Sequence, residues 1–194
     1  MTFEEAADAL VAVGRAFDAR GWAPATSGNY SARLGDGRIA ITVSGTHKGR
    51  LSSDDIMVLG AGDPRRPSAE TALHQAIYAR FPEAGAVLHS HAATSVALGR
   101  TIGDEWAIEG HELLKALPGI DTHDTTVRIP IVENSQDMAV LEAVVAPRLG
   151  EVPAFMIRGH GLYGWGRDVA EAERVVEALE WLAECALAER RFRA

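Results

Sequence analysis

The sequence predicts an α/β protein in which a mixed, mainly antiparallel sheet is flanked by helices. Segments with helical periodicity alternate along the chain with short apolar segments of strand length. Few of these strands are the long, uninterrupted apolar runs that a purely parallel sheet buries on both faces. The 194 residues contain no internal repeat, low-complexity tract or long linker. We therefore expect a single domain that spans residues 1–194.

The first elements are predicted from capping signals and apolar spacing. Residues 2–20 form a helix, because Thr2 and Glu5 have the spacing of a capping box and apolar residues recur at steps of three and four. A loop is expected over residues 23–31. Residues 39–43 read as a short strand that ends in a turn, and residues 52–55 begin a short piece that is either helical or extended.

Glycine, proline and hydroxyl residues delimit the elements that follow. A loop over residues 60–68 ends at Ser68, which is predicted to cap a helix over residues 69–80. Residues 86–91 are apolar and short, so they are predicted to form a buried strand, and a helix over residues 92–100 follows.

The second half of the chain continues the alternation. Residues 109–117 are predicted to be helical, and residues 126–132 to form a strand in which Pro130 indicates an edge position or a bulge. The remaining expected elements are a helix over 137–149, a strand over 154–157, a glycine-rich loop over 158–166, and a long helix that Asp168 caps and that runs to about residue 188.

Composition restricts the functions that this chain can have. The formal net charge is −8, from 19 basic and 27 acidic residues, which argues against nucleic acid as a partner. No apolar run approaches the roughly 18 to 20 residues that cross a bilayer, and the acidic start does not resemble a secretory signal, so we expect a cytoplasmic protein. Cys185 is the only cysteine, so any metal must be held by His, Asp or Glu.

Three histidines are candidates for a metal site. His89 and His91 lie at the end of the predicted strand 86–91, and residues i and i+2 of a strand point to the same side. His160 lies between two glycines, which allow the backbone to approach closely. Catalytic zinc commonly has about three protein ligands and one open position. Each histidine alone is more often a solvated or hydrogen-bonded loop residue, but the combination favours a metal.

Three short segments have the composition of anion-binding loops. They contain Gly28 with Asn29, Ser44 with Gly45, and Ser68 at the expected helix start. Small residues leave backbone N–H groups accessible, and a helix N-terminus favours negative charge. Each segment alone is more often an ordinary turn, so the hypothesis requires the fold to bring them together.

Two glutamates are candidates for proton transfer, although their spacing alone does not distinguish them from ordinary helix residues. Glu70 lies in the expected first turn after Ser68, where a carboxylate is a common partner of the helix dipole. Glu112 lies in a segment that reads as a solvated helix with Lys115 nearby.

Five segments together resemble the class II aldolase/adducin superfamily. They read, in order, SGNYS, ITVSGTHKG, SAETALH, AVLHSHA and RGHGLYGWG, and a long terminal helix follows them. The match covers roughly residues 20 to 190. Within the superfamily the chain is most similar to the methylthioribulose-1-phosphate dehydratases, through EGHELLKALPGIDTHDTTVRIPIVENSQDM and the HGLYGWG segment.

The resemblance implies an α/β/α fold around a mainly antiparallel sheet, with one Zn²⁺ per subunit. The zinc ligands of the family fall on His89, His91 and His160. Its phosphate-binding positions fall on Asn29, Ser44, Gly45 and Ser68, and Ala69 stands where aldolases often carry a second serine, which puts one phosphate contact in doubt.

The resemblance also implies an activity and an assembly. In sugar-phosphate aldolases the catalytic glutamate matches Glu70, whereas in the dehydratases the acid/base matches Glu112, which is the favoured candidate here. The expected reaction is dehydration of 5-methylthioribulose 1-phosphate in methionine salvage, in a homotetramer with active sites near subunit interfaces. The alternatives are a fuculose- or rhamnulose-phosphate type aldolase, a 4-epimerase and, more remotely, a non-catalytic adducin-like scaffold module.

Overall fold

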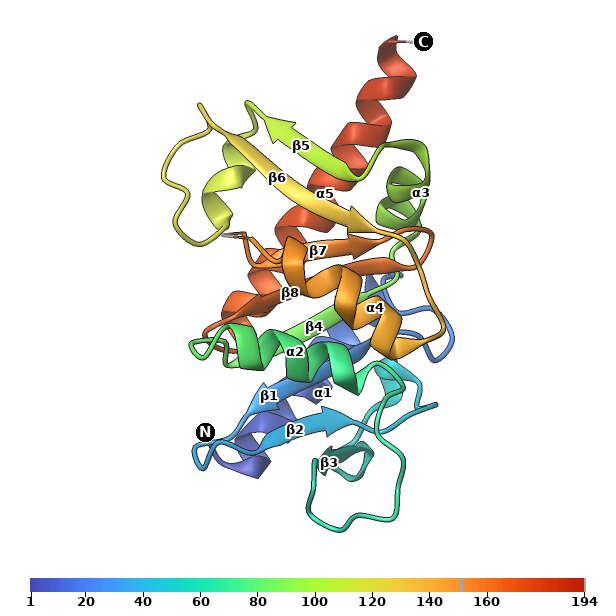
Figure 1. The fold of residues 1–194 in the computed structure, drawn as a ribbon, viewed down its shortest axis with the longest axis vertical. Coiled ribbons are helices and arrows are strands. Elements are labelled where there is room, and N and C mark those ends of the chain that lie inside the picture. Colours follow the sequence, from blue (N-terminus) through green and yellow to red (C-terminus); the bar gives the residue numbers. More distant parts are fainter. Residues whose placement is uncertain (151, 194) are drawn as a thin grey trace.

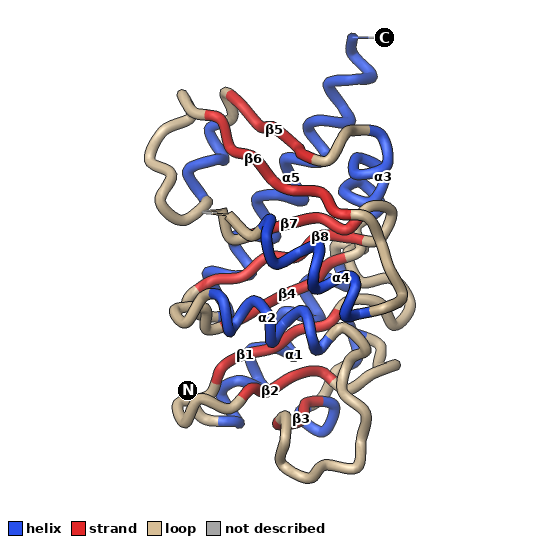
Figure 2. The backbone as a smooth tube through the Cα atoms, in the orientation of Figure 1, coloured by secondary structure: helices blue, strands red, loops and turns tan. Residues whose placement is uncertain are grey.

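The computed structural model describes residues 1–150 and 152–193, and its centre is one eight-stranded sheet. The strands lie in the order β3-β2-β1-β4-β8-β7-β6-β5 (Figure 2). All described neighbours are antiparallel except β6 and β7, which are parallel. The strand bounds are β1 (Asn29–Arg33), β2 (Ile39–Thr42), β3 (Ile56–Val58), β4 (Ala86–Ser90), β5 (Glu105–Glu109), β6 (Thr126–Val132), β7 (Ala154–Ile157) and β8 (Gly161–Gly166).

Helices cover both faces of this sheet, which confirms the predicted α/β/α class. The helices are α1 (Phe3–Ala19), α2 (Thr71–Arg80), α3 (Ala93–Thr101), α4 (Met138–Val145) and α5 (Val169–Arg193). Helices α2 and α4 lie on one face, and α1, α3 and α5 lie on the other (Figure 1). None of the described helices combines the length and apolar character needed to cross a bilayer.

The apolar side chains form one cluster on each face of the sheet, as the strand period of two requires. In β4, Leu88 belongs to the cluster beneath α1 and α5, whereas Val87 belongs to the cluster beneath α2 and α4. The same alternation places Met156 of β7 on the first face and Phe155 on the second. Because His89 follows Leu88 in register, it shares the α2 side with Val87.

Several predicted boundaries are confirmed together with their signals. Helix α1 begins with the expected capping box, in which the Thr2 side chain accepts from the Glu5 amide and the Glu5 side chain accepts from the Thr2 amide. Asp168 Oδ1 accepts from the Glu171 amide at 2.8 Å at the start of α5. The predicted helix 137–149 corresponds to α4 followed by the short 3-10 helix η4 (Ala146–Arg148).

Two segments that were predicted to be loops are strands. The predicted loop 23–31 contains the start of β1, and the predicted loop 158–166 contains all of β8. Glycine is unfavourable in strands, which is why β8 was missed. A Cβ on Gly164 would lie 2.7 Å from Val176 of α5, and one on Gly166 would lie 2.6 Å from the Ala172 amide nitrogen. The glycines are therefore required because α5 packs directly on the strand.

The predicted helix 109–117 is wrong in type. Residues 105–109 form the edge strand β5, and Gly110, with a φ of 71°, separates it from the 3-10 helix η3 (Glu112–Ala116). The prediction that Ser68 caps α2 is also wrong. The helix begins at Thr71 with Glu70 as its N-cap, and the Ser68 hydroxyl accepts from the Glu70 amide at 3.4 Å.

Pro130 lies in β6, which is not an edge strand, because β5 pairs with it. The amide of the next residue, Ile131, donates to Asp104 on the β5 side, so the nitrogen of Pro130 faces the β7 side. The ladder with β7 begins only at Ile131. No strand pairing therefore requires the N–H that proline lacks.

Candidate active site

A cavity of about 440 Å³ lies where the ends of β1, β2 and β4 meet the start of α2. Every residue that was predicted to bind an anion lines it, so the fold brings the three predicted loops together. The lining also includes residues from the segment between β6 and α4. The residues of the wall are Thr26, Ser27, Gly28, Asn29, Thr42, Val43, Ser44, Gly45, Lys48, Ser68, Ala69, Glu70, His91, Ser135, Gln136, Met138 and His160.

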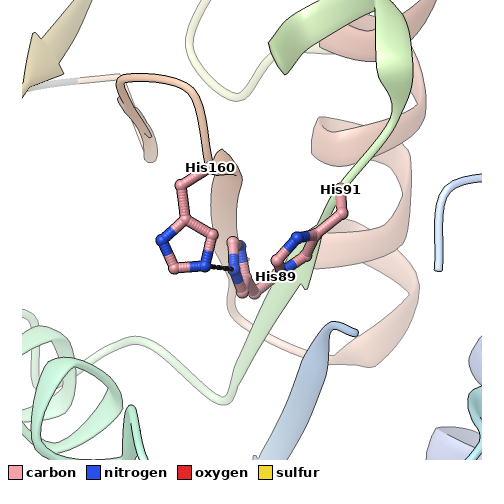
Figure 3. Close-up of side chains that lie close together, drawn as sticks. All are labelled: His89, His91 and His160. Carbon is pink, nitrogen blue, oxygen red and sulfur yellow. Dashed lines mark hydrogen bonds between the residues drawn. The ribbon is translucent and has the colours of Figure 1, made fainter. Parts of the chain in front are cut away.

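The three predicted metal ligands converge on one another (Figure 3), and two of them, His91 and His160, also line this cavity. One nitrogen from each of His89, His91 and His160 lies within 4.8 Å of the other two. The His89 and His160 Nε2 atoms are 3.4 Å apart, and the His89 and His91 ring centroids are 4.4 Å apart. Residues 71 positions apart in the sequence thus meet because β8 pairs with β4.

The electrostatic surroundings keep two of these rings neutral. The His89 Nδ1–H donates to the Leu162 carbonyl at 2.9 Å, which leaves the Nε2 lone pair directed into the cluster. Burial and the nearby His160 hold the pKa of His89 well below its usual value. Burial also lowers the pKa of His91 to about 3. Neutral imidazoles are the form that binds metals.

The residues present fit a divalent transition metal. Three imidazole nitrogens are a donor set used by zinc and by other divalent transition metals. The Nδ1–H bond from His89 to a backbone carbonyl is the arrangement that commonly orients a histidine ligand. His160 Nδ1 is buried and has no partner within residues 1–150 and 152–193. The chain thus offers a three-histidine metal site, as the sequence predicted.

Glu70 lies beside this cluster and is held by two donors. Its Oε2 accepts from Asn29 Nδ2 at 2.6 Å and from the Tyr163 hydroxyl at 2.8 Å. Its Oε1 lies 3.1 Å from His160 Nε2. The Oε2 atom is also 3.4 Å from His89 Nε2. The carboxylate is therefore positioned at the boundary between the histidine cluster and the anion-binding loops.

His74 of α2 fixes the orientation of Asn29. Burial lowers the pKa of His74 to about 4, so the ring is neutral and carries one N–H. Its Nε2–H donates to Asn29 Oδ1, and its Nδ1 accepts from the Ser31 hydroxyl at 2.7 Å. The Tyr78 hydroxyl lies 2.9 Å from Ser31 Oγ and completes the chain. The Asn29 amide therefore presents its NH₂ group, and not its oxygen, to Glu70.

The anion-binding loops approach the histidines through glycine. Gly28 and Gly45 have φ values of 79° and 77°, which side-chain-bearing residues rarely adopt. A Cβ on Gly28 would lie 2.8 Å from the His89 carbonyl oxygen. Within the described residues, the amide nitrogens of Gly28, Gly45 and Ala69 have no hydrogen-bond acceptor. These N–H groups are available to an anion in the cavity.

Glu112 is the one predicted site residue that lies neither in the wall of this cavity nor in the histidine cluster. It lies in η3, and its side chain is 72% exposed. It pairs with Lys115 and lies 3.5 Å from His123. The hydrogen bond from Lys115 lowers the pKa of Glu112. Within one chain the histidine cluster and Glu112 are separate.

The sequence predictions missed four polar residues of the site. Lys48 lines the cavity as a buried cation, and Tyr163 and His74 support Glu70 and Asn29. Their spacing in the sequence does not identify them, because the burial and the hydrogen-bond partners of these side chains depend on the order of the strands in the sheet. The fourth residue, Ser135, lies in the segment ENSQDM and lines the cavity. A short polar run directly after a predicted strand could have indicated a residue of the site.

Comparison with known proteins gives consistent matches over almost the whole chain. A family model described as Class II Aldolase and Adducin N-terminal domain matches residues 8–187. A methylthioribulose-1-phosphate dehydratase of Methylococcus capsulatus is 54% identical over 187 residues, covering 93% of this chain and 92% of that protein. A protein of the same name from Acidiphilium cryptum is 49% identical, covering 95% and 90% of the two chains.

Solved structures with this fold include sugar-phosphate aldolases. The L-fuculose-1-phosphate aldolase of Thermus thermophilus superposes with a TM-score of 0.78 and 28% identity, covering 96% of this chain and 94% of that one. YgbL of Klebsiella pneumoniae, described as a putative aldolase/epimerase/decarboxylase, superposes with a TM-score of 0.82 and 23% identity, covering 97% and 91%. This second likeness concerns the fold alone. Because the family model spans nearly the whole sequence, the chain belongs to the family of class II aldolases and adducin N-terminal domains.

Proposed function

We propose that this chain is a hydro-lyase that dehydrates 5-methylthioribulose 1-phosphate to 2,3-diketo-5-methylthiopentyl 1-phosphate, a reaction of methionine salvage. The observation that carries this choice within the family is the 54% identity over 93% of the chain to a methylthioribulose-1-phosphate dehydratase. The cavity supports it, because a three-histidine cluster and a set of anion-binding loops lie at the same place, as a phosphorylated ketose requires.

His89, His91 and His160 would hold the metal, which we propose to be one Zn²⁺ per subunit. When bound, the ion supplies Lewis-acid polarisation of the C2 ketone of the substrate. The loops at Gly28, Gly45 and Ser68 hold the phosphate and thereby fix the distance between the ketone and the reacting carbons. With the ketone and the phosphate bound in this way, the carboxylates carry out the proton transfers.

The reaction requires a base at C3 and an acid at C4. A carboxylate removes the C3 proton, and the C4 hydroxyl leaves as water after receiving a proton. A C3–C4 double bond forms, and the resulting enol tautomerises to the 2,3-diketone. Atoms balance, because the substrate loses only one water.

The two candidate carboxylates differ in where they can act. Glu70 lies in the cavity of its own chain, with Oε1 at 3.1 Å from His160, and is a neighbour of the metal site. Glu112 is exposed, so it can serve as the acid/base only in the cavity of a neighbouring subunit. We propose this second arrangement, in a homotetramer whose active sites lie near subunit interfaces.

The experiment that tests the activity uses the zinc-loaded protein and 5-methylthioribulose 1-phosphate. We expect a product that is lighter by one water and has the carbon-13 signals of a 2,3-diketone. An aldehyde together with dihydroxyacetone phosphate would instead identify a retro-aldol enzyme. The similar structure from Thermus thermophilus is named as an aldolase. No conversion by zinc-loaded protein would contradict both readings.

Three further expectations accompany this proposal. The continuous sheet supports one domain over residues 1–194. The choice of zinc over other divalent metals is tested by metal analysis of protein purified without added metal. Cytoplasmic location is a prediction from the sequence, which a fractionation experiment can test.

A further inference from the structure

Lys48 is a buried lysine. It begins the 3-10 helix η1 (Lys48–Arg50), and only 2% of the residue is exposed. Helix α1 packs against its backbone so closely that a Cβ on Gly14 would clash with the Lys48 carbonyl. The side chain lines the cavity described above.

The ammonium joins the two loops that form the sides of the anion-binding region. Lys48 Nζ donates to the Thr26 carbonyl at 3.0 Å and to the Thr46 carbonyl at 2.7 Å. Thr26 precedes Ser27-Gly28-Asn29, and Thr46 follows Ser44-Gly45. An ammonium has three N–H donors, and the third finds no acceptor in the part of the chain that the structure describes.

No ion pair within the described residues neutralises this charge, and the one acidic side chain that favours the ammonium form, Asp55, acts at longer range. No carboxylate oxygen there lies within 4.0 Å of Lys48 Nζ. Burying a cation without an opposite charge is costly, and here burial lowers the pKa of Lys48 to about 8. Glu70 is the only acidic residue in the described wall of the cavity, and its Oε2 is already bonded to Asn29 and Tyr163.

The remaining wall offers donors. The hydroxyls of Ser44 and Ser68 and the amide N–H groups of Gly28 and Gly45 surround the same space, whereas the Ser27 hydroxyl already donates to the Pro24 carbonyl. A doubly charged tetrahedral anion accepts several hydrogen bonds at once and also neutralises a buried ammonium. The chemistry of this wall therefore matches a phosphate monoester.

We propose that Lys48 supplies the positive charge of the phosphate subsite, donating its third N–H to the phosphate monoester while it holds the two loops together. This inference rests on the proposed function for the identity of the substrate. If so, Lys48 makes the protein bind a phosphorylated ketose more tightly than the same ketose without its phosphate.

The decisive measurement uses the zinc-loaded wild-type protein and inorganic phosphate. The chain has only two lysines, so protein labelled with [ε-¹³C]lysine gives one signal from Lys48 and one from Lys115. Lys115 pairs with Glu112 on the surface and serves as the internal control. We expect phosphate to move the titration midpoint of Lys48 upward by about one to two units and to leave Lys115 unchanged, because a 10- to 100-fold preference for the ammonium form requires that shift.

Two results would overturn the proposal. One is phosphate binding, detected by calorimetry, with an unchanged Lys48 midpoint. The other is the absence of phosphate binding to the wild-type protein at the highest concentration tested. Neither result depends on turnover, so the proposed dehydration can fail while the phosphate subsite stands, and the reverse.

Substitution provides the second arm. Lys48→Met should raise the inhibition constant of phosphate and the KM of the phosphorylated ketose by about 10- to 100-fold, with zinc content unchanged. Arg38→Met removes one exposed charge from the β1–β2 turn and is the matched control. Binding of the unphosphorylated 5-methylthioribulose should be the same in Lys48→Met and wild type. An equal loss for both sugars would indicate that Lys48 only supports the loops, and would contradict the proposal.

Discussion

Two buried glutamates flank β4, and their surroundings differ. Glu70 lies on the cavity side, where two donors hold one oxygen and the other oxygen faces His160. Glu180 of α5 lies on the opposite side, where its Oε1 accepts from Ser90 at 2.5 Å and from Ser95 at 3.0 Å. Its Oε2 is buried and has no partner within the described residues.

This difference shows how the two faces of one strand can have different roles, with candidate catalytic residues on one face and structural contacts on the other. Successive residues of a strand point to opposite faces, so His89 and His91 enter the cavity while Ser90, between them, contacts Glu180. Burial raises the pKa of Glu180 to about 7. On the cavity side, hydrogen-bond donors and histidine rings surround the Glu70 carboxylate. On the α5 side, burial favours the neutral carboxyl form of Glu180.

Removing a histidine of the cavity side should have the largest effect. His89→Ala deletes one of three metal-binding nitrogens, so we expect a folded protein with little bound zinc and only background turnover. Metal analysis, circular dichroism and the diketone assay check the three parts. Full activity in metal-free protein would contradict the metal site and the proposed mechanism with it.

The two candidate acid/base residues should each matter, but in different subunits. Glu112→Gln and Glu70→Gln should each lower kcat by about 100-fold or more while zinc content stays intact. When Glu112→Gln is mixed with His89→Ala in one oligomer, roughly a quarter of the sites combine an intact cluster with an intact Glu112 from a neighbour, and activity should return.

Glu70→Gln mixed with His89→Ala is the matched control, and it should stay inactive, because Glu70 and the histidines belong to the same chain. Rescue of both mixtures would show that Glu70 also acts across subunits. Rescue of neither, or a Glu112→Gln protein with more than about a tenth of the wild-type rate, would remove Glu112 from the mechanism.

On the α5 side, Glu180→Gln should change stability and its pH dependence. Because the folded pKa is raised to about 7, the folded state binds more protons than the unfolded state between pH 4.5 and 7, so stability falls as pH rises through this window. The variant removes this loss but leaves one amide donor unpaired. At pH 8 we expect it to exceed wild type by about 2 kcal/mol in the free energy of unfolding. Denaturant titrations at pH 4 and pH 8 test this, and equal pH slopes would contradict it.

The smallest expected effect concerns the support of Asn29. His74→Leu removes the donor that orients the Asn29 amide, and we expect kcat/KM to fall by about 10-fold without loss of zinc. His74→Gln retains an N–H donor and should recover most of the activity. Tyr78→Phe alters only the far end of the chain of hydrogen bonds and is the control. Wild-type kinetics in His74→Leu would show that Asn29 is held by other contacts.

The sequence was sufficient where the signal is local. The capping box at Thr2, the short apolar run that forms the buried strand β4 and the i, i+2 spacing of His89 and His91 depend only on neighbouring residues, and the structure has each feature as expected. The convergence of His160 with them followed from the resemblance and from glycine spacing, and the pairing of β4 with β8 provides it.

The sequence was insufficient where a distant element decides the outcome. Strand β8 is a strand because α5 covers glycines that would otherwise favour a loop. The burial of Lys48 depends on α1, which packs against its backbone, and its hydrogen bonds depend on carbonyls from two separate loops. For Glu112 the periodicity did not reveal that its side chain is exposed and separate from the histidine cluster of the same chain.

The glycines of β8 also determine where this fold can vary. A side chain at Gly161 would clash with the Ser90 carbonyl and displace the His89 ring, so almost any substitution there would disturb the metal cluster. Ser135, Gln136 and Met138 also line the cavity, and they belong to the segment that connects β6 to α4 and to the start of α4, which supplies no histidine of the cluster. Substitutions in that segment can therefore reshape the cavity wall while β8 and the histidine cluster stay unchanged.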